Sequence, residues 1–550
     1  VKRAYFNAKI DEGQHTYVAL PAEDPDSGVL CAELLRHMYG TRAAADGWQE
    51  EYSSTLVSAL GFSQGESCPC VFRHEERGIV LNVHGDDFTA TGPKRALDWF
   101  EATMREQYEL TTQPRLGPGD GDAKEVIILN RITRWTEKGL EYEADPRQAE
   151  KLTAECGRGG SNTCATPGVR ASFAELENDS PLDPKFHTAY RGAAARANYL
   201  SADRMDVQFA AKEICRFMSA PTQHSWQALK RLCRYLVGLP RLVYCYAWQD
   251  VEAIDIYMDT DWAGCPRTRK STNGGCALLG SHTIKTWSST QSGVSLSSGE
   301  AEFNGVVRGA GVGLGYQSLL EDLGVTLPAR VWTDSSAAIG ISTRQGLGKL
   351  RLLDTHTLWI QQAVRTGKID LRKVLGEVNP ADLFTKHSLS RERLKGLVAL
   401  FDCHFRSGRA DSAPKMRTEV ADKKTVSDAD LATVGERLIF PHLEYAKPEL
   451  DRLYPPMAVP EVVGAGDPQQ DEDDPILVEG YRLAAELVKA CEEQGRKRRL
   501  EAYGDNADVQ LATHTPGNAA VQLATHTPTP EGQPLGTLTA GTDRSVGRSV

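Results

Sequence analysis

The sequence predicts a multidomain protein that mixes α/β and α+β architecture, with a mixed five-stranded sheet and helices in its C-terminal half. Three observations lead to this. The chain has 550 residues, more than one hydrophobic core usually organises. Hydrophobic residues make up 40% and charged residues 25%, as in ordinary globular proteins. β-branched runs alternate with helical patterns until about residue 395, where regular patterning weakens.

The first 250 residues predict strands and helices in alternation. Residues 77–88 (RGIVLNVHGDDF) form a β-branched run that ends in carboxylates, and residues 97–108 have the periodicity of a helix. Residues 117–122 (GPGDGD) have the composition of a loop. Further along, the patterns predict two strands around a turn in 124–143, a helix in 146–156, a linker in 157–167 and a long helical region in 187–239.

From residue 251 the order of patterns is three strands, a helix, a strand, two helices, a strand and a last helix. Such an order is typical of a domain built from layers of helices on a sheet. The predicted strands are 253–258, 275–279, 283–288, 329–333 and 368–374; the longer helices are 299–323 and 354–366, and the last helix follows Asn379 and Pro380.

The end of the chain predicts a mostly disordered tail. The segment VQLATHTP occurs at 509–516 and again at 521–528, among Gly, Thr and Pro residues. We expect limited proteolysis to cleave this part first. One amphipathic helix is expected at 476–493. The basic run 496–499 fits either a nuclear localisation signal or, preferably, the solvated end of that helix.

Composition narrows the class of protein. The twelve cysteines are scattered, without zinc-ligand spacing or a disulfide framework, which fits an intracellular protein with reduced thiols. Neither a membrane-spanning run nor a signal peptide is present in the sequence, so secretion is not expected. The net charge of −11 argues mildly against a nucleic-acid-binding protein. The acidity is partly local, as at 471–474, and Lys230, Arg231 and Arg234 form a basic segment.

The first candidate site is the pair Asp86 and Asp87 at the end of an apolar strand. Two adjacent acids are costly there unless they are solvated or hold a cation. In a tight hairpin they could hold Mg²⁺, which prefers oxygen ligands. A polar β-turn is the alternative, and the dipeptide by itself favours the turn.

The second candidate site consists of four acids at element boundaries in the C-terminal half. Strand ends and helix starts can converge at one sheet edge, where ligands commonly bind. Four carboxylates would repel there unless two divalent ions lay between them, an arrangement that hydrolyses phosphodiesters. The alternative roles are helix caps for two of them and a helix-dipole contact for a third. The four are Asp259 and Asp334 at strand ends and Glu300 and Asp382 at helix starts.

Eight segments of the sequence resemble parts of the Pol polyprotein of copia-type retrotransposons and occur in the same order along the chain as in that family. The resemblance covers about residues 1–390. VKRAYFNAKIDEG resembles the reverse transcriptase segment after the first catalytic Asp, and VHGDDFTATG stands where the family has YVDD. The other segments are MYGTRAAADGW (38–48), the connecting region 190–238, DTDWAGCPRTRKSTNGG (259–275), WSSTQSGVSLSSGEAEF (287–303), WTDSSAAIGI (332–341) and NPADLFTKHSL (379–389).

The resemblance implies a partial reverse transcriptase followed by an RNase H-like domain, both dependent on Mg²⁺ or Mn²⁺. It implies that Asp86 and Asp87 are the polymerase metal pair and that Asp259, Glu300, Asp334 and Asp382 are the nuclease ligands, with Asp261 outside the set. The implied domains are a partial palm (1–110), a thumb-like region (111–167), a connection (180–250), the RNase H-like domain (251–390) and the tail (391–550).

The implied partners are an RNA–DNA hybrid, an RNA template with a DNA primer, and the rest of the parent polyprotein. The implied location is a cytoplasmic particle or the nucleus. We expect RNase H endonuclease activity on the RNA strand, and we interpret the chain as a Pol fragment with an incomplete polymerase half. The rival hypothesis is a decayed or repurposed scaffold that binds nucleic acid without catalysis.

The sequence departs from the family pattern at three places. The absent first Asp and the altered histidine region, together with the acidic pI, favour the rival, whereas the intact set of four acids favours the enzyme. The first polymerase Asp would stand immediately before Val1 and is not in the sequence. His84 and Gly85 replace the usual Tyr-Val, and we expect Gly85 to weaken the strand. The family's KHID…H pattern reads Arg351 to Asp354, with Leu358 where a His is expected and His356 two positions earlier.

Overall fold

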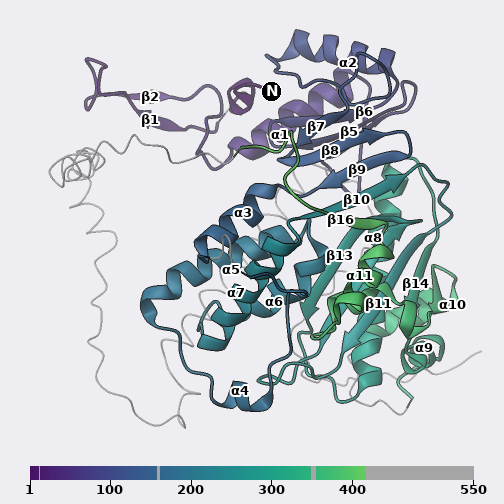
Figure 1. Cartoon of the computed structure of the whole chain (residues 1–550). Helices are drawn as coiled ribbons and strands as arrows, with labels where there is room; N and C mark the ends of the chain where they lie inside the picture. The colour runs from purple at the N-terminus through teal and green to yellow at the C-terminus, as the bar shows by residue number, and fades with distance from the viewer. Residues whose placement is uncertain (12, 158–161, 349–354, 416–550) are drawn as a thin grey trace, which may run out of the picture. The chain divides into compact units, whose positions relative to one another are not determined.

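The computed structural model describes residues 1–11, 13–157, 162–348 and 355–415, all within one compact unit (Figure 1). Three larger sheets and a group of helices build this unit. None of its described helices combines the length and the apolar character that crossing a bilayer requires. The predicted mixture of helices and sheets is therefore present.

The N-terminal sheet is antiparallel, in the order β3-β4-β5-β6. Helix α2 packs on it through Ala96, Phe100 and Met104, which repeat every four residues on one face. The helix predicted at 97–108 is thus confirmed, starting three residues earlier. The elements are α1 (Ala44–Ser54), β3 (Ser63–Gln64), β4 (Val71–His74), β5 (Ile79–His84), β6 (Asp87–Thr91) and α2 (Lys94–Gln107); a small sheet of β1 (Tyr17–Ala19) and β2 (Cys31–Glu33) precedes them.

The middle sheet is antiparallel, in the order β16-β10-β9-β8-β7. Its strands come from segments that the sequence assigned to three different domains. Residues 124–143 hold three strands rather than the predicted two, because the chain turns at Leu129 and Asn130 with positive φ angles of 48° and 68°. A leucine at such a position is no turn signal. The strands are β7 (Glu125–Ile128), β8 (Arg131–Thr136), β9 (Gly139–Glu143), β10 (Arg241–Ala247) and β16 (Cys403–Arg406).

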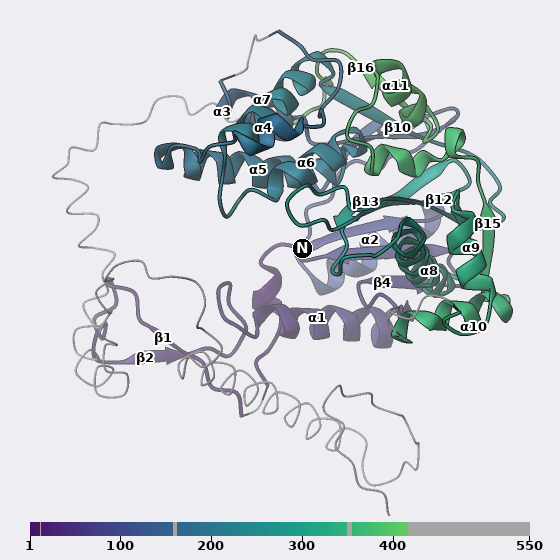
Figure 2. The same ribbon diagram turned by 90° about the horizontal axis from the view of Figure 1, so that it is seen from below.

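Four helices, α3, α5, α6 and α7, lie together beside the middle sheet (Figures 1 and 2). They share a core with the sheet, and that core encloses an ion pair between Arg204 and Asp206, with Nη2 and Oδ2 2.7 Å apart. Tyr235 donates a hydrogen bond to the same carboxylate. The predicted helical regions are confirmed. The helices are α3 (Pro146–Glu155), α4 (Phe173–Glu177), α5 (His187–Ser201), α6 (Gln208–Cys215) and α7 (Gln223–Gly238).

The C-terminal sheet is the predicted mixed five-stranded sheet, in the order β13-β12-β11-β14-β15. Strand β11 pairs antiparallel with β12 and parallel with β14, which pairs parallel with β15. The elements are β11 (Ile254–Asp261), β12 (Thr272–Leu279), β13 (His282–Thr290), α8 (Ser298–Asp322), β14 (Ala329–Thr333), α9 (Ser336–Thr343), α10 (Trp359–Arg365) and β15 (Ile369–Lys373).

The long helix α8 approaches β11 closely because glycines line the contact. A Cβ at Gly309 would lie 2.7 Å from Cγ of Met258, and one at Gly313 would lie 3.3 Å from the Ile256 side chain. Gly305 continues the four-residue spacing. Since residues four apart share a helix face, this stripe fixes which face of α8 meets the sheet.

The predicted tail begins too early. Helix α11 (Arg391–Ala399) and strand β16 belong to the folded unit. Leu394 and Leu397 are buried, and β16 pairs with β10. Both elements are short and have polar residues on either side, so no local pattern predicted them. Their stability comes from packing on distant segments. The tail from residue 416 onward, with its expected helix, repeat and basic run, lies outside the described residues.

Candidate active site

Three carboxylates meet at one edge of the C-terminal sheet. Asp259 lies on β11 and is buried, and Asp334 directly follows β14. These strands are parallel, with Met258 opposite Thr333, so their carboxyl ends share one edge. Glu302 reaches the same point from the first turns of α8. Carboxylate oxygens of all three residues lie within 4.8 Å of one another.

The three acids of this group have little positive charge near them, so burial and mutual repulsion raise the pKa values of two of them. Burial, then Asp259 and Asp334, raise the pKa of Glu302 to about 8. Burial, then Asp259, raise the pKa of Asp334 as well. Oε2 of Glu302 is buried without a hydrogen-bond partner among the described residues. Oxygen donors that are close together, buried and partly unsatisfied fit the needs of a hard divalent cation.

Glu300, the residue that the sequence assigned to this site, does not join it. Its carboxylate accepts a hydrogen bond from the backbone N–H of Leu296 at 2.9 Å, and its own N–H donates to Ser297 Oγ. It therefore has the helix-start role that was its alternative. Two positions along an α-helix rotate a side chain by about 200°, so Glu302 faces the sheet and Glu300 does not.

A signal for Glu302 was present in the sequence. Gly305 and Gly309 stand three and seven positions after it, and both face the sheet. Residues at these spacings share one face of a helix. The glycine stripe therefore marks the second acid of GEAEF as the one directed at β11.

Asp382 lies beside the group and is joined to it through Lys386. Nζ of Lys386 is 2.9 Å from Asp259 Oδ2 and 3.4 Å from Asp382 Oδ1. Arg393 donates a second charged hydrogen bond to Asp382. Burial lowers the pKa of Lys386, but Asp259 and Asp382 outweigh it and raise the pKa. The ammonium thus compensates part of the negative charge.

The cap roles considered for Asp334 and Asp382 are wrong. The side chain of Ser335 caps α9, and that of Asn379 caps the 3-10 helix Pro380–Phe384, which stands where the last helix was predicted. Neither aspartate is thus tied to a helix end. Asp261, two residues beyond Asp259, lies outside the group of three and faces His387, with Oδ2 3.5 Å from Nε2.

Asp86 and Asp87 lie exposed at the tip of the β5–β6 hairpin. Gly85 has a φ of 64°, the conformation that a two-residue hairpin turn favours in its first position. The expected cost of this glycine to the strand is wrong, because Gly85 lies in the turn. Trp48 Nε1 donates to Gly85 O at 2.9 Å, and the Val1 nitrogen donates to Asp86 O at 2.7 Å.

The altered histidine pattern is only partly visible. Residues 351–354 and the side chain of His356 lie outside the described part of the chain. Leu358, where the family has a histidine, packs against the core between α8 and the C-terminal sheet. A leucine there supplies packing and no titratable group.

Several known proteins with similar sequences are Pol polyproteins of retrotransposons. It is 28% identical over 371 residues to the retrovirus-related Pol polyprotein from transposon RE2 of Arabidopsis thaliana, covering 66% of this chain and 24% of that protein. It is 23% identical over 399 residues to the corresponding polyprotein from transposon TNT 1-94 of Nicotiana tabacum, covering 70% of this chain and 29% of that one. The chain is therefore a homologue of copia-type retrotransposon Pol polyproteins. The resemblance seen in the sequence is confirmed.

The chain spans about a quarter of the length of the curated relatives it matches. No protein-family model matches it. Among solved structures it is similar to a foamy viral protease-reverse transcriptase in complex with dsDNA, at 10% identity and a TM-score of 0.17, covering 68% of this chain and 66% of that one. A score this low adds nothing to the fold, which rests on the strand order above.

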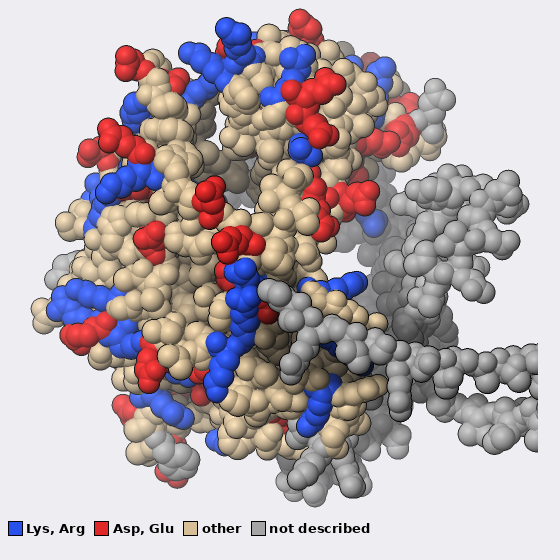
Figure 3. Space-filling model, turned by 90° about the vertical axis from the view of Figure 1, so that its right-hand side faces the viewer, with Lys and Arg blue, Asp and Glu red and all other residues tan. Residues whose placement is uncertain are grey.

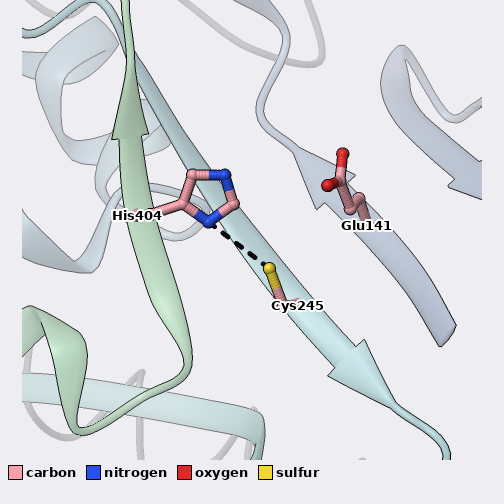
Figure 4. Close-up of side chains that lie close together, drawn as sticks. All are labelled: Glu141, Cys245 and His404. Atoms are coloured by element: carbon pink, nitrogen blue, oxygen red, sulfur yellow. Dashed lines mark hydrogen bonds between the residues drawn. The ribbon is translucent and has the colours of Figure 1, made fainter. Parts of the chain in front are cut away.

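The chain has a second group of possible metal ligands on the middle sheet, which the sequence did not reveal. Glu141, Cys245 and His404 come from β9, β10 and β16 (Figure 4). Sγ of Cys245 lies 3.4 Å from Nδ1 of His404. Arg406 already donates to Glu141 and to Nε2 of His404, each at 2.9 Å. Because the guanidinium of Arg406 already compensates the charge of Glu141, this group lacks the charge deficit of the sheet-edge acids.

Proposed function

We propose that residues 251–390 of this Pol chain form an RNase H-like nuclease that cuts the RNA strand of RNA–DNA hybrids. The observation that carries the proposal is the group of Asp259, Glu302 and Asp334 on a mixed five-stranded sheet. Glu302 takes the role that the sequence prediction gave to Glu300. Asp382 completes the set from the other side of Lys386.

The donor set supports Mg²⁺ or Mn²⁺ as the cofactor. All the donor atoms of this set are carboxylate oxygens, and hard divalent cations prefer such ligands. Bound divalent ions at such a site supply an activated water and stabilise the leaving oxygen of an in-line displacement. Asp259 and Asp334 would hold ions from the strand ends, and Glu302 from the helix.

The side chains around the group orient its central acid. Thr385 and Lys386 both donate hydrogen bonds to Oδ2 of Asp259, so the second oxygen of that carboxylate remains for a ligand. Shape and 2′-hydroxyl contacts would select RNA in the hybrid. The products would be a 3′-hydroxyl and a 5′-phosphate.

The test is cleavage of a labelled RNA–DNA duplex by the purified chain with Mg²⁺ or Mn²⁺. Asp259→Asn keeps the side-chain size and removes the central charge, so it should abolish cutting while leaving the fold intact. Asp261→Asn is the matched control on the same strand and should be much milder. A folded wild type that never cuts with either ion would support the non-catalytic scaffold instead.

We further propose that Asp86 and Asp87 are the metal pair of an RNA-directed DNA polymerase part, which would act on an RNA template with a DNA primer. Their place at a tight hairpin supports this. The Val1 nitrogen lies 2.7 Å from the Asp86 carbonyl oxygen, so an aspartate placed immediately before Val1 would lie beside the turn. The other parts of the parent polyprotein would be the partners, in a cytoplasmic particle or the nucleus.

A further inference from the structure

A cavity of about 710 Å³ lies between α6, α7 and the loop that follows β11. It is separate from the acid group, yet the two share two segments. The loop at Gly264–Arg267 continues from β11, which carries Asp259. His387 lines the cavity, and its neighbour Lys386 binds Asp259. Whatever occupies the cavity therefore lies next to the proposed nuclease site.

The lining of the cavity is strongly basic although the whole chain carries a net charge of −11. Two acids also line it, and both are already engaged. Glu175 accepts from the Ser172 backbone N–H at 2.7 Å, and Glu213 pairs with Lys212 and Arg216. The six cations come from four segments far apart in sequence: Arg170, Arg216, Lys230, Arg231, Arg234 and Arg267.

Five of these six cations have no carboxylate partner among the described residues; only Arg216 is ion-paired. Nε of Arg231 is buried without a hydrogen bond in that same part of the chain. Some arginines elsewhere in this unit are ion-paired, as Arg204 is with Asp206. Like charges gathered in a hollow raise the local positive potential and attract anions. The lining of the cavity therefore has the charge that attracts a polyanion.

We propose that this cavity binds the sugar–phosphate backbone of one nucleic-acid strand and presents that strand to the acid group. The inference rests on the proposed function for the identity of its ligand. Five of the six cations are arginines, whose planar guanidinium matches phosphate oxygens in a two-pronged fashion. The guanidinium carbon of Arg267 lies 4.4 Å from the centre of the Phe217 ring, which holds the charge at the cavity.

A contrast with the rest of the surface supports the assignment. On the face shown in Figure 3, acidic and basic side chains are intermixed. In the cavity, by contrast, six cationic side chains surround the hollow, and the two acids there are bound to other groups. Sequence-independent binding of nucleic acid depends on such charge–phosphate contacts and weakens steeply with salt.

The test uses three cations that make no side-chain hydrogen bond with described residues, so that their loss leaves the fold intact. The cavity variant is Arg170→Gln, Lys230→Gln, Arg267→Gln. The matched control is Lys94→Gln, Lys151→Gln, Lys368→Gln, which removes the same charge from exposed sites outside the cavity. Binding of labelled single-stranded DNA, single-stranded RNA and polyglutamate to the full chain is measured in EDTA across a salt series.

We expect the cavity variant to bind either nucleic acid at least about tenfold more weakly and to reduce the salt slope by about 2, since each single-strand contact contributes about 0.7. The single change Arg267→Gln, in an exposed loop, should reduce the slope by about 0.7. The control should match the wild type. Equal losses in both triple variants, or polyglutamate binding as tight as that of the oligonucleotides, would overturn the proposal.

Because EDTA prevents cleavage, binding and catalysis are scored separately. Loss of binding in the cavity variant with a wild type that never cuts hybrids would uphold the cavity and reject the nuclease. A wild type that cuts, with a cavity variant that binds like the control, would do the reverse.

Discussion

The two clusters of acidic side chains that are proposed as metal sites differ in their burial and in the charges around them. Asp86 and Asp87 lie on an exposed hairpin tip, where water solvates both charges. Asp259, Glu302 and Asp334 crowd at a partly buried sheet edge, and the pKa of Glu302 rises to about 8 through burial and its two neighbours. In the folded state the buried cluster has too little positive charge around it, and this favours cation binding. The exposed hairpin pair has no such deficit until other ligands join it.

Burial by itself does not create this need. Asp206 is also buried, yet Arg204 binds it with two hydrogen bonds. Within the described part of the chain, Lys386 is the one cation that pairs with a member of the group of three, and it is shared between Asp259 and Asp382. A deficit of compensating charge therefore separates a candidate catalytic group from a structural ion pair.

The largest effect that would sharpen the comparison comes from the two acids of α8. Glu302→Gln should lower hybrid cleavage by at least about a hundredfold, because it removes a ligand worth several kcal/mol in the transition state. Glu300→Gln should change cleavage little and cost about 0.3–1 kcal/mol of stability at the helix start. Single-turnover cleavage and thermal unfolding of both variants measure this. The reverse order of activities would return the role to Glu300.

The second prediction uses pH. The pKa of Glu302 in the folded state, about 8, is above that of an exposed glutamate, so the folded state holds an extra proton between these values. The associated stability is complete below the unfolded pKa and is lost as pH rises through about 8. Melting temperature in EDTA should therefore fall from pH 5 to pH 9. Glu302→Gln should flatten that fall; an unchanged slope would contradict the assigned environment.

The third prediction compares the groups by their response to metal. Mg²⁺ at a hundred times its dissociation constant should stabilise the wild type by about 2.7 kcal/mol. At this size of domain that corresponds to several degrees in melting temperature. The shift should vanish in Asp259→Asn and persist in the double change Asp86→Asn, Asp87→Asn. A shift that depends on the hairpin acids would reverse the comparison.

The smallest effect is expected at the hairpin itself. The double change Asp86→Asn, Asp87→Asn should alter unfolding free energy by less than about 0.5 kcal/mol, because both side chains are exposed. A polypeptide starting at Val1 should not extend a primer on an RNA template, since two-metal transfer needs a third carboxylate. Nucleotide incorporation checks this, and robust extension that depends on Asp86 would refute it.

Sequence alone predicted most of the elements of this protein and its similarity to a known family. Alternating patterns located the strands of the C-terminal sheet, and the order of motifs identified the copia-type family. Local polar patterns also put Asp259 and Asp334 at strand ends. Such features depend on neighbours a few residues apart, so they can be inferred without knowing the fold.

Only the tertiary structure decided which residues meet. The choice of Glu302 over Glu300 depends on the face that α8 turns toward β11. The middle sheet joins strands from residues 125–143, 241–247 and 403–406, and its edge strand lies in a segment assigned to the tail. The basic cavity gathers cations from four separate segments between residues 170 and 267. Packing between segments sets these contacts, and no local pattern encodes which distant residues will meet.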